Sequence, residues 1–384
     1  MQAHPLHPNL PESRNRSPEN TVRRSPAYSL QIPDIHSQAL IFLFDHCPKF
    51  PKFEGDVGTR DPAQYDMHLH SELILKDIVL FPDMLDQLAG VVDSKLHHLG
   101  GNLPRVSRSA NLHPTWVLSA LQRGSGLSVG PEGNIRNSYF PLQHLSSLVA
   151  LTLFAGLDRW SNIFRYSTRP YSMMPYALAD GYMSLDENVI ARAGLPEDVN
   201  SDIQLVIEMG LSDSLMFWDF QSMNTGSEGV MRAISYYLAG SKFPWTCCPT
   251  FRSCGGRFCR KTDDMFNFQF AITGYETGED GGIFEDGSDI EFGVWAEAVN
   301  VDATFMVLDV GSREFIGIRD RKLQRLYLSP LIDLDDPNSL PVGYFKVHAG
   351  LQIAALLDVI RRAKRLNALS RLPVFYTFEY DRGD

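Results

Sequence analysis

The chain has 384 residues, of which 44% are hydrophobic and 21% are charged, proportions that are ordinary for a globular protein. No apolar run is long enough to span a bilayer, so we expect no transmembrane segment. The five cysteines are an odd number, and the N-terminus lacks the apolar core of a secretory signal. These features predict reduced thiols in a cytosolic protein and exclude a disulfide scaffold.

The first 33 residues differ from the rest in composition. Residues 1–33 contain six prolines, few apolar side chains and four arginines, Arg14, Arg16, Arg23 and Arg24. Such a segment cannot bury enough surface to offset the entropy of ordering it. Its charge is +2, which leaves −13 for residues 34–384. We therefore expect a disordered basic arm on an acidic body, with these arginines as the candidate contacts to an anionic partner.

Helical patterns dominate up to residue 240. Apolar residues recur at helical spacing over residues 71–99, where Pro82 predicts two helices or one kinked helix. Residues 142–157 are apolar nearly all round, as in a helix at the centre of a core. The aromatic-rich residues 166–182 indicate a buried connector or an exposed contact surface, and we favour the connector. Further helices are predicted over residues 115–123, 200–220 (divided near Gly210) and 227–238.

Strand patterns follow. Alternating or β-branched and aromatic stretches predict strands over residues 266–273, 290–299, 303–310, 315–319 and 324–328. A hairpin turn at residues 311–313, a long helix at 347–366 and a strand at 374–380 complete the chain. This order predicts an α+β fold, predominantly α-helical in its N-terminal two-thirds and β-rich after residue 260. We expect the arm at 1–33, a helical lobe at 34–240 and an α+β lobe at 241–384.

One short motif has the spacing of a metal site. Asp66, His68 and His70 form an Asp-x-His-x-His pattern. It resembles the first metal-binding motif of amidohydrolase and PHP-type hydrolases, where two histidines on one face of a strand bind zinc. Here no apolar strand precedes the motif and a helical pattern follows it. We therefore favour a helix entry and predict neither a metal nor another cofactor.

Three other clusters could carry chemistry, and each has a simpler structural interpretation. Four cysteines lie among basic residues without the CxxC pairs typical of zinc, so we expect free thiols on a basic loop that could contact phosphate. Acidic residues between 276 and 291 lack the ligand positions of a calcium-binding EF-hand and indicate a solvated loop. A basic helix end complements the helix dipole. The cysteines are Cys247, Cys248, Cys254 and Cys259, and the basic residues are Arg361, Arg362, Lys364 and Arg365.

The layout as a whole resembles the coat proteins of partitiviruses, small double-stranded RNA viruses of fungi and plants. The shared features are an arm rich in proline, serine and arginine (Arg14 to Arg24), an acidic helix-rich body and aromatic connectors such as residues 166–182. The resemblance implies a protein without enzymatic activity whose homodimers assemble into an icosahedral capsid, found in the virion and the host cytoplasm. Its arms would point inward onto the RNA genome. Four arginines neutralise little phosphate, so the arm would tether the RNA and not condense it.

Two other classes of protein stay open. A metal-dependent hydrolase would use His68 and His70 and would hold stoichiometric zinc. A soluble regulatory or interaction protein would use the arm as a docking segment and would stay monomeric or dimeric at high concentration. The state of assembly separates the capsid protein from both.

Overall fold

A computed structural model describes the parts of the chain on which the fold rests. The described residues are 40, 43–45, 47–48, 73, 75–99, 131–158, 160–167, 181–213, 215–220, 295, 298–299, 301–309, 311–336 and 339–370. All of them belong to one compact unit, residues 34–384. None of the described helices is both long and apolar enough to cross a bilayer.

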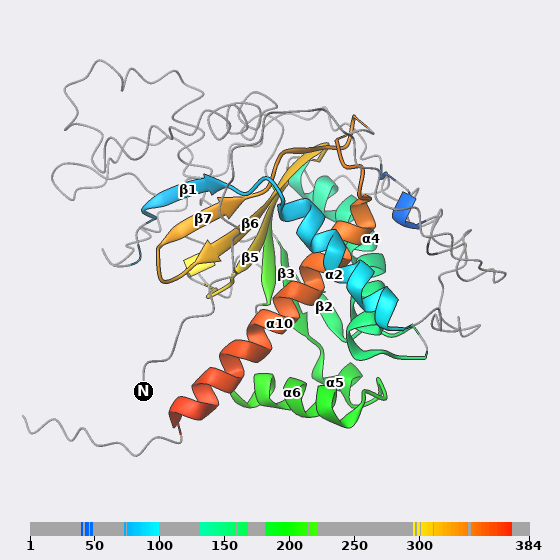
Figure 1. Ribbon diagram of the computed structural model, residues 1–384, viewed down its shortest axis with the longest axis vertical. Coiled ribbons are helices and arrows are strands. Elements are labelled where there is room, and N and C mark those ends of the chain that lie inside the picture. The colour runs from blue at the N-terminus through cyan, green and yellow to red at the C-terminus, as the bar shows by residue number, and fades with distance from the viewer. Residues whose placement is uncertain are drawn as a thin grey trace, which may run out of the picture. The chain divides into compact units, whose positions relative to one another are not determined.

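The centre of this unit is a mixed eight-stranded sheet with the order β1-β7-β6-β5-β4-β3-β2 and with β8 paired to β6 (Figure 1). The pairs β1–β7 and β4–β5 are parallel and the others antiparallel. Strands from either side of residue 240 therefore share one sheet. The strands are β1 (Asp77–Leu80), β2 (Phe164–Ser167), β3 (Gly181–Leu185), β4 (Met216–Phe220), β5 (Phe305–Asp309), β6 (Arg313–Asp320), β7 (Arg325–Leu328) and β8 (Ile332–Asp333).

Helix α10 is the element around which the other helices pack. It contacts α2, α4 and α6. The contact with α2 is very close, because a Cβ atom on Gly350 would lie 1.9 Å from the backbone oxygen of Leu88. The helices are α2 (Met84–His98), α4 (Pro131–Ala155), α5 (Glu187–Ile190), α6 (Glu197–Glu208) and α10 (Tyr344–Ser370).

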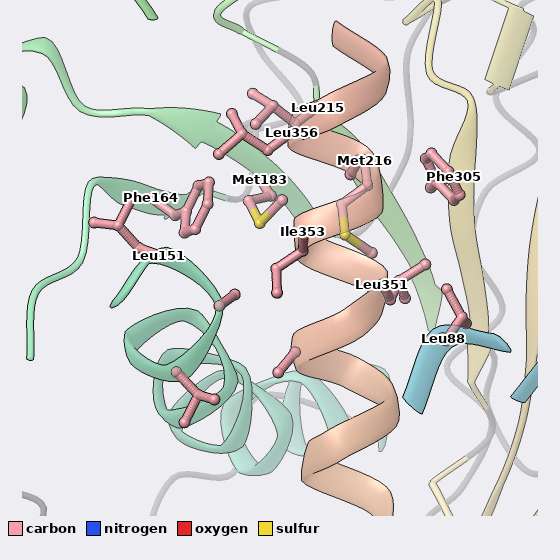
Figure 2. Packing of buried hydrophobic residues seen from close by; sticks show 14 of the residues in the cluster. Leu88, Leu151, Phe164, Met183, Leu215, Met216, Phe305, Leu351, Ile353 and Leu356 are labelled. Carbon is pink, nitrogen blue, oxygen red and sulfur yellow. The ribbon is translucent and has the colours of Figure 1, made fainter. Parts of the chain in front are cut away.

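Apolar side chains cover both faces of the sheet. On one face, residues of α10 such as Leu351 and Ile353 pack with Leu151 of α4 and with Met183 and Met216 of the sheet (Figure 2). On the other face, a smaller cluster contains Trp295, whose indole N–H donates to the backbone oxygen of Leu73 over 2.8 Å. Burial on both sides is why strands such as β4 are apolar at almost every position.

Several predicted elements are confirmed, and with them the α+β class. The apolar segment 142–157 lies almost wholly within α4, and the predicted helix 347–366 lies within α10. Strands predicted at 303–310, 315–319 and 324–328 correspond to β5, β6 and β7, and residues 311–313 join an antiparallel β5–β6 hairpin.

The prediction of helix throughout residues 71–99 was wrong in its first part. Residues Asp77–Leu80 form β1, which pairs in parallel with β7. Ile78 and Val79 are β-branched and suit a strand, and an ion pair of 2.9 Å joins Asp77 to Arg325 of β7. Pro82 therefore separates a strand from a helix, and does not kink one helix.

The other wrong predictions fall mostly in buried segments. These segments are apolar at nearly every position, so their sequences show neither the period of a helix nor that of a strand. Residues 200–220 were predicted as helix, but α6 ends before Gly210, which has a φ of +68°, and Met216–Phe220 form the fully buried β4. The predicted connector 166–182 begins and ends in β2 and β3. Within the predicted strand 290–299, the described residues Trp295, Ala298 and Val299 are helical. Strands β1 to β4 thus occur in the part of the chain expected to be predominantly helical.

Candidate functional site

Most of the residues singled out from the sequence lie outside the described residues. These are the arginines Arg14, Arg16, Arg23 and Arg24, the motif Asp66, His68 and His70, the four cysteines from Cys247 to Cys259, and the acidic stretch 276–291. Sequence reasoning missed one further pattern, Gly126-x-Ser128-x-Gly130, whose spacing is found at the nucleophile of α/β-hydrolases. It too lies outside the described residues. Within the described part of the chain, no group of His, Cys, Asp and Glu is placed to hold a metal ion.

The described residues contain a hydrogen-bonded polar network buried between the sheet, α4 and α10. Its centre is Glu314 of β6, which is completely buried. Tyr139 of α4 and Tyr344 of α10 donate to Oε2 of Glu314 over 3.3 and 3.2 Å. His348 Nε2 lies 2.6 Å from Oε1. The carboxylate of Glu314 thus connects the sheet to both α4 and α10 through hydrogen bonds.

The network continues from His348 through two glutamines to a serine. Gln143 Nε2 lies 3.2 Å from His348 Nδ1, and Gln352 Nε2 donates to Gln143 Oε1 over 3.0 Å. Ser147 donates to Gln352 Oε1 over 2.8 Å. With His348 as the Nε2–H tautomer, every donor in this series points toward Glu314, which is the final acceptor.

A second carboxylate faces Glu314 across the β5–β6 hairpin. Asp309 is 1% exposed and is the direct partner of Glu314 in the antiparallel register. The backbone N–H of Gly311 donates to its Oδ1. Within the described part of the chain, Oδ2 has no hydrogen-bond partner. Burial, and then the charge of Glu314, raise the pKa of Asp309 well above its usual range.

The burial of this network limits what it can do chemically. Asp309, Glu314 and His348 are all at most 1% exposed, so a substrate cannot reach them in this conformation. Burial first, and then the charge of Glu314, also raise the pKa of Tyr139 and Tyr344, so both phenols stay neutral donors. A buried polar network of this kind, in which Glu314 binds side chains from both helices, stabilises one arrangement of the elements that it joins.

At the surface, three arginines surround Asp302, a residue with a left-handed φ of 49°. Arg321 Nε and Arg362 Nη1 lie 2.9 Å from its carboxylate oxygens, and Arg319 Nη1 lies 3.5 Å away. Burial, and then the neighbouring charge of Arg321, lower the pKa of Arg319 to about 10. The arginines also bind backbone oxygens, including that of Ala298 at 2.7 Å from Arg319, so the cluster holds this turn against β6 and α10.

The basic end of α10 is only partly the solvated helix end expected from the sequence. Arg362 is bound by Asp302, and Lys364 lies 2.7 Å from Asp202 of α6. Arg361 and Arg365 are exposed. Two leucines on the same end of the helix, Leu366 and Leu369, are 43% and 55% exposed. This end therefore presents apolar and basic side chains together.

Sequence reasoning missed the buried network because its members are far apart in the chain. Glu314 and His348 come from β6 and α10, and Tyr139 and Gln143 from α4. The available signal was the position of Glu314 next to the strand residues Phe315 and Ile316. A carboxylate in a buried strand requires a partner, although the sequence does not say which one.

The chain was compared with known protein families, curated proteins and solved structures, and it matches none of them.

Proposed function

We propose that this chain is a structural protein that assembles with copies of itself into an icosahedral, virus-like shell enclosing a double-stranded RNA genome. The observation that carries the proposal is the end of α10, where Leu366 and Leu369 are exposed on a long helix fixed to the body of the protein. Large exposed apolar side chains that lie together mark contact sites more often than isolated ones do. A protein of this kind would be found in the virion and the host cytoplasm.

The end of α10 is suited to contact between two proteins. Leu366 and Leu369 are three residues apart and therefore lie on one face of the helix. Figure 1 shows this end, in red, beside α6, and the ion pair of Lys364 with Asp202 fixes the two helices together. A rigid helix loses little conformational entropy when it binds a partner.

A second copy of the chain is the partner that the charges favour. The exposed Arg361 and Arg365 can pair with carboxylates of a second copy, and α6 presents the exposed Glu197, Asp198 and Glu208. A basic apolar helix end next to an acidic helix is a patch that complements itself, as an isologous contact requires. Homodimers formed in this way would be the building blocks of the shell.

The distribution of charge along the chain supports an RNA-enclosing role. Residues 1–33 carry +2 and residues 34–384 carry −13. Arg14, Arg16, Arg23 and Arg24 would tether the genome through its phosphates. The acidic body would repel the duplex and leave it free to move inside the shell.

Light scattering and negative-stain microscopy on the full-length protein test this proposal. The wild type is expected to form large uniform particles, and the double variant Leu366→Glu, Leu369→Glu is expected to lose them. Leu323→Glu is the matched control, because Leu323 lies in the turn between β6 and β7 and is 42% exposed, almost as exposed as Leu366. The control should assemble like the wild type.

A wild type that stays monomeric or dimeric at high concentration would overturn the shell proposal. Two classes would then remain. Stoichiometric zinc that is lost on replacing His68 and His70 would identify a metal-dependent hydrolase. A metal-free monomer or dimer would instead be a regulatory or interaction protein that docks through its arm.

A further inference from the structure

Asp309 and Glu314 are two acidic groups that the fold buries beside each other. They face each other in the β5–β6 register, and both are buried. The donors around them are distributed unequally. Within the described part of the chain, Glu314 receives hydrogen bonds from Tyr139, Tyr344 and His348, whereas Asp309 receives one from the backbone N–H of Gly311 alone. Glu314 is therefore equipped to carry a negative charge, and Asp309 is not.

We propose that the folded protein holds a proton on Asp309 at neutral pH, and that loss of this proton weakens the attachment of α4 and α10 to the sheet. The pair is thus a pH-sensitive element in the core. It goes beyond the proposed function, because the protonation depends only on the fold of a single chain.

The groups that face Asp309 and Glu314 favour a single negative charge on these two carboxyl groups together. From β6 there is Glu314, from α4 Tyr139, and from α10 Tyr344 and His348. The two phenols are neutral, and His348 accepts from Gln143 at Nδ1 while its Nε2 faces Glu314. Among the described residues, no lysine or arginine forms an ion pair with either carboxylate. An ionised Asp309 would therefore place a second negative charge beside Glu314, in a region of low dielectric where repulsion is strong.

Deprotonation would act on the helices through Glu314. The three side chains that hold this carboxylate come from both helices, so a charge that displaces Glu314 also disturbs α4 and α10. The sign follows from linkage. Because the pKa of Asp309 is raised on folding, the folded state binds more protons than the unfolded state, and stability falls as pH rises from the unfolded-state pKa of about 4 toward the folded-state pKa.

The test compares denaturant unfolding of the full-length wild type and Asp309→Asn from pH 5 to pH 9. Asparagine has nearly the shape of the protonated acid and keeps an oxygen for the N–H of Gly311. The ratio of the wild-type unfolding constant to that of the variant should rise by up to tenfold per pH unit, the value for one proton. Asp213→Asn, which replaces an exposed aspartate, should leave the pH dependence unchanged.

Two results would overturn the proposal. One is parallel stability curves for the wild type and Asp309→Asn. The other is a pH dependence that disappears in Glu314→Gln and persists in Asp309→Asn, which would place the proton on the other carboxyl group. If Asp309→Asn does not fold, calorimetry of wild-type unfolding in buffers of different ionisation enthalpy provides the readout. Release of a proton at pH 7 is expected, and unfolding without proton release would contradict the assignment.

Discussion

At the residue scale, Glu314 shows how hydrogen bonds reduce the free-energy cost of burying a carboxylate. Removing a carboxylate from water is unfavourable unless hydrogen bonds replace its hydration. Glu314 receives donors from Tyr139, Tyr344 and His348, and Trp218 in turn donates to the hydroxyl of Tyr139 over 3.1 Å. The carboxylate thus accepts three hydrogen bonds, from two helices, in place of its hydration.

His348→Leu should therefore be strongly destabilising. The variant removes the closest donor to Glu314 and leaves a buried carboxylate only partly compensated, which costs about 3–5 kcal/mol in the free energy of unfolding. His98→Leu is the control, since His98 is exposed at the end of α2, and it should change the free energy by less than about 0.5 kcal/mol. Urea unfolding of both variants gives the comparison. Equal effects would mean that the contact of His348 with Glu314 contributes nothing.

At the element scale, the helices that form the core were more predictable than the strands that they cover. Residues 142–155 of α4 and residues 347–366 of α10 have long apolar faces and were predicted as helix, whereas the first eleven residues of α4 were not. Strands β1 and β4 are four or five residues long and form through pairing with β7 and β5, which are distant in the chain. Short apolar runs carry no period that separates strand from helix.

The close approach of α2 and α10 gives a prediction at this scale. A Cβ atom at position 350 would lie 1.9 Å from the backbone oxygen of Leu88, so Gly350→Ala forces the two helices apart. We expect a loss of about 1–3 kcal/mol or more in the free energy of unfolding. Helix propensity alone predicts the opposite sign, because alanine is the better helix former.

Gly90→Ala is the matched control for this variant. Gly90 lies in α2 itself, and a Cβ atom there would meet nothing within 4 Å. This change should stabilise the protein by about 0.5–1 kcal/mol. Thermal unfolding of the two variants would show opposite shifts of the melting temperature. A stabilising Gly350→Ala would mean that the helices are not packed as closely as described.

At the scale of the whole molecule, the proposed function gives the basic arm and the acidic body opposite roles toward RNA. The buried network between the sheet, α4 and α10 could not be predicted from the sequence, because its residues meet only after folding. The segregation of charge between residues 1–33 and 34–384 is visible directly. Under the proposed function, attraction to RNA comes from the arm alone, and its strength is limited by four arginines.

Replacing Arg14, Arg16, Arg23 and Arg24 with alanine should therefore abolish binding to double-stranded RNA. In the chain kept unassembled by Leu366→Glu and Leu369→Glu, four phosphate contacts give a slope of log affinity against log salt no steeper than about −4. Fluorescence anisotropy of a labelled duplex over a salt series measures both quantities. A steeper slope, or binding that survives the arginine replacements, would locate the RNA contact on the body. RNA bound to the body would be repelled by a net charge of −13. The distribution of charge therefore predicts weak binding through the arm alone, with an affinity that falls only gradually as the salt concentration rises.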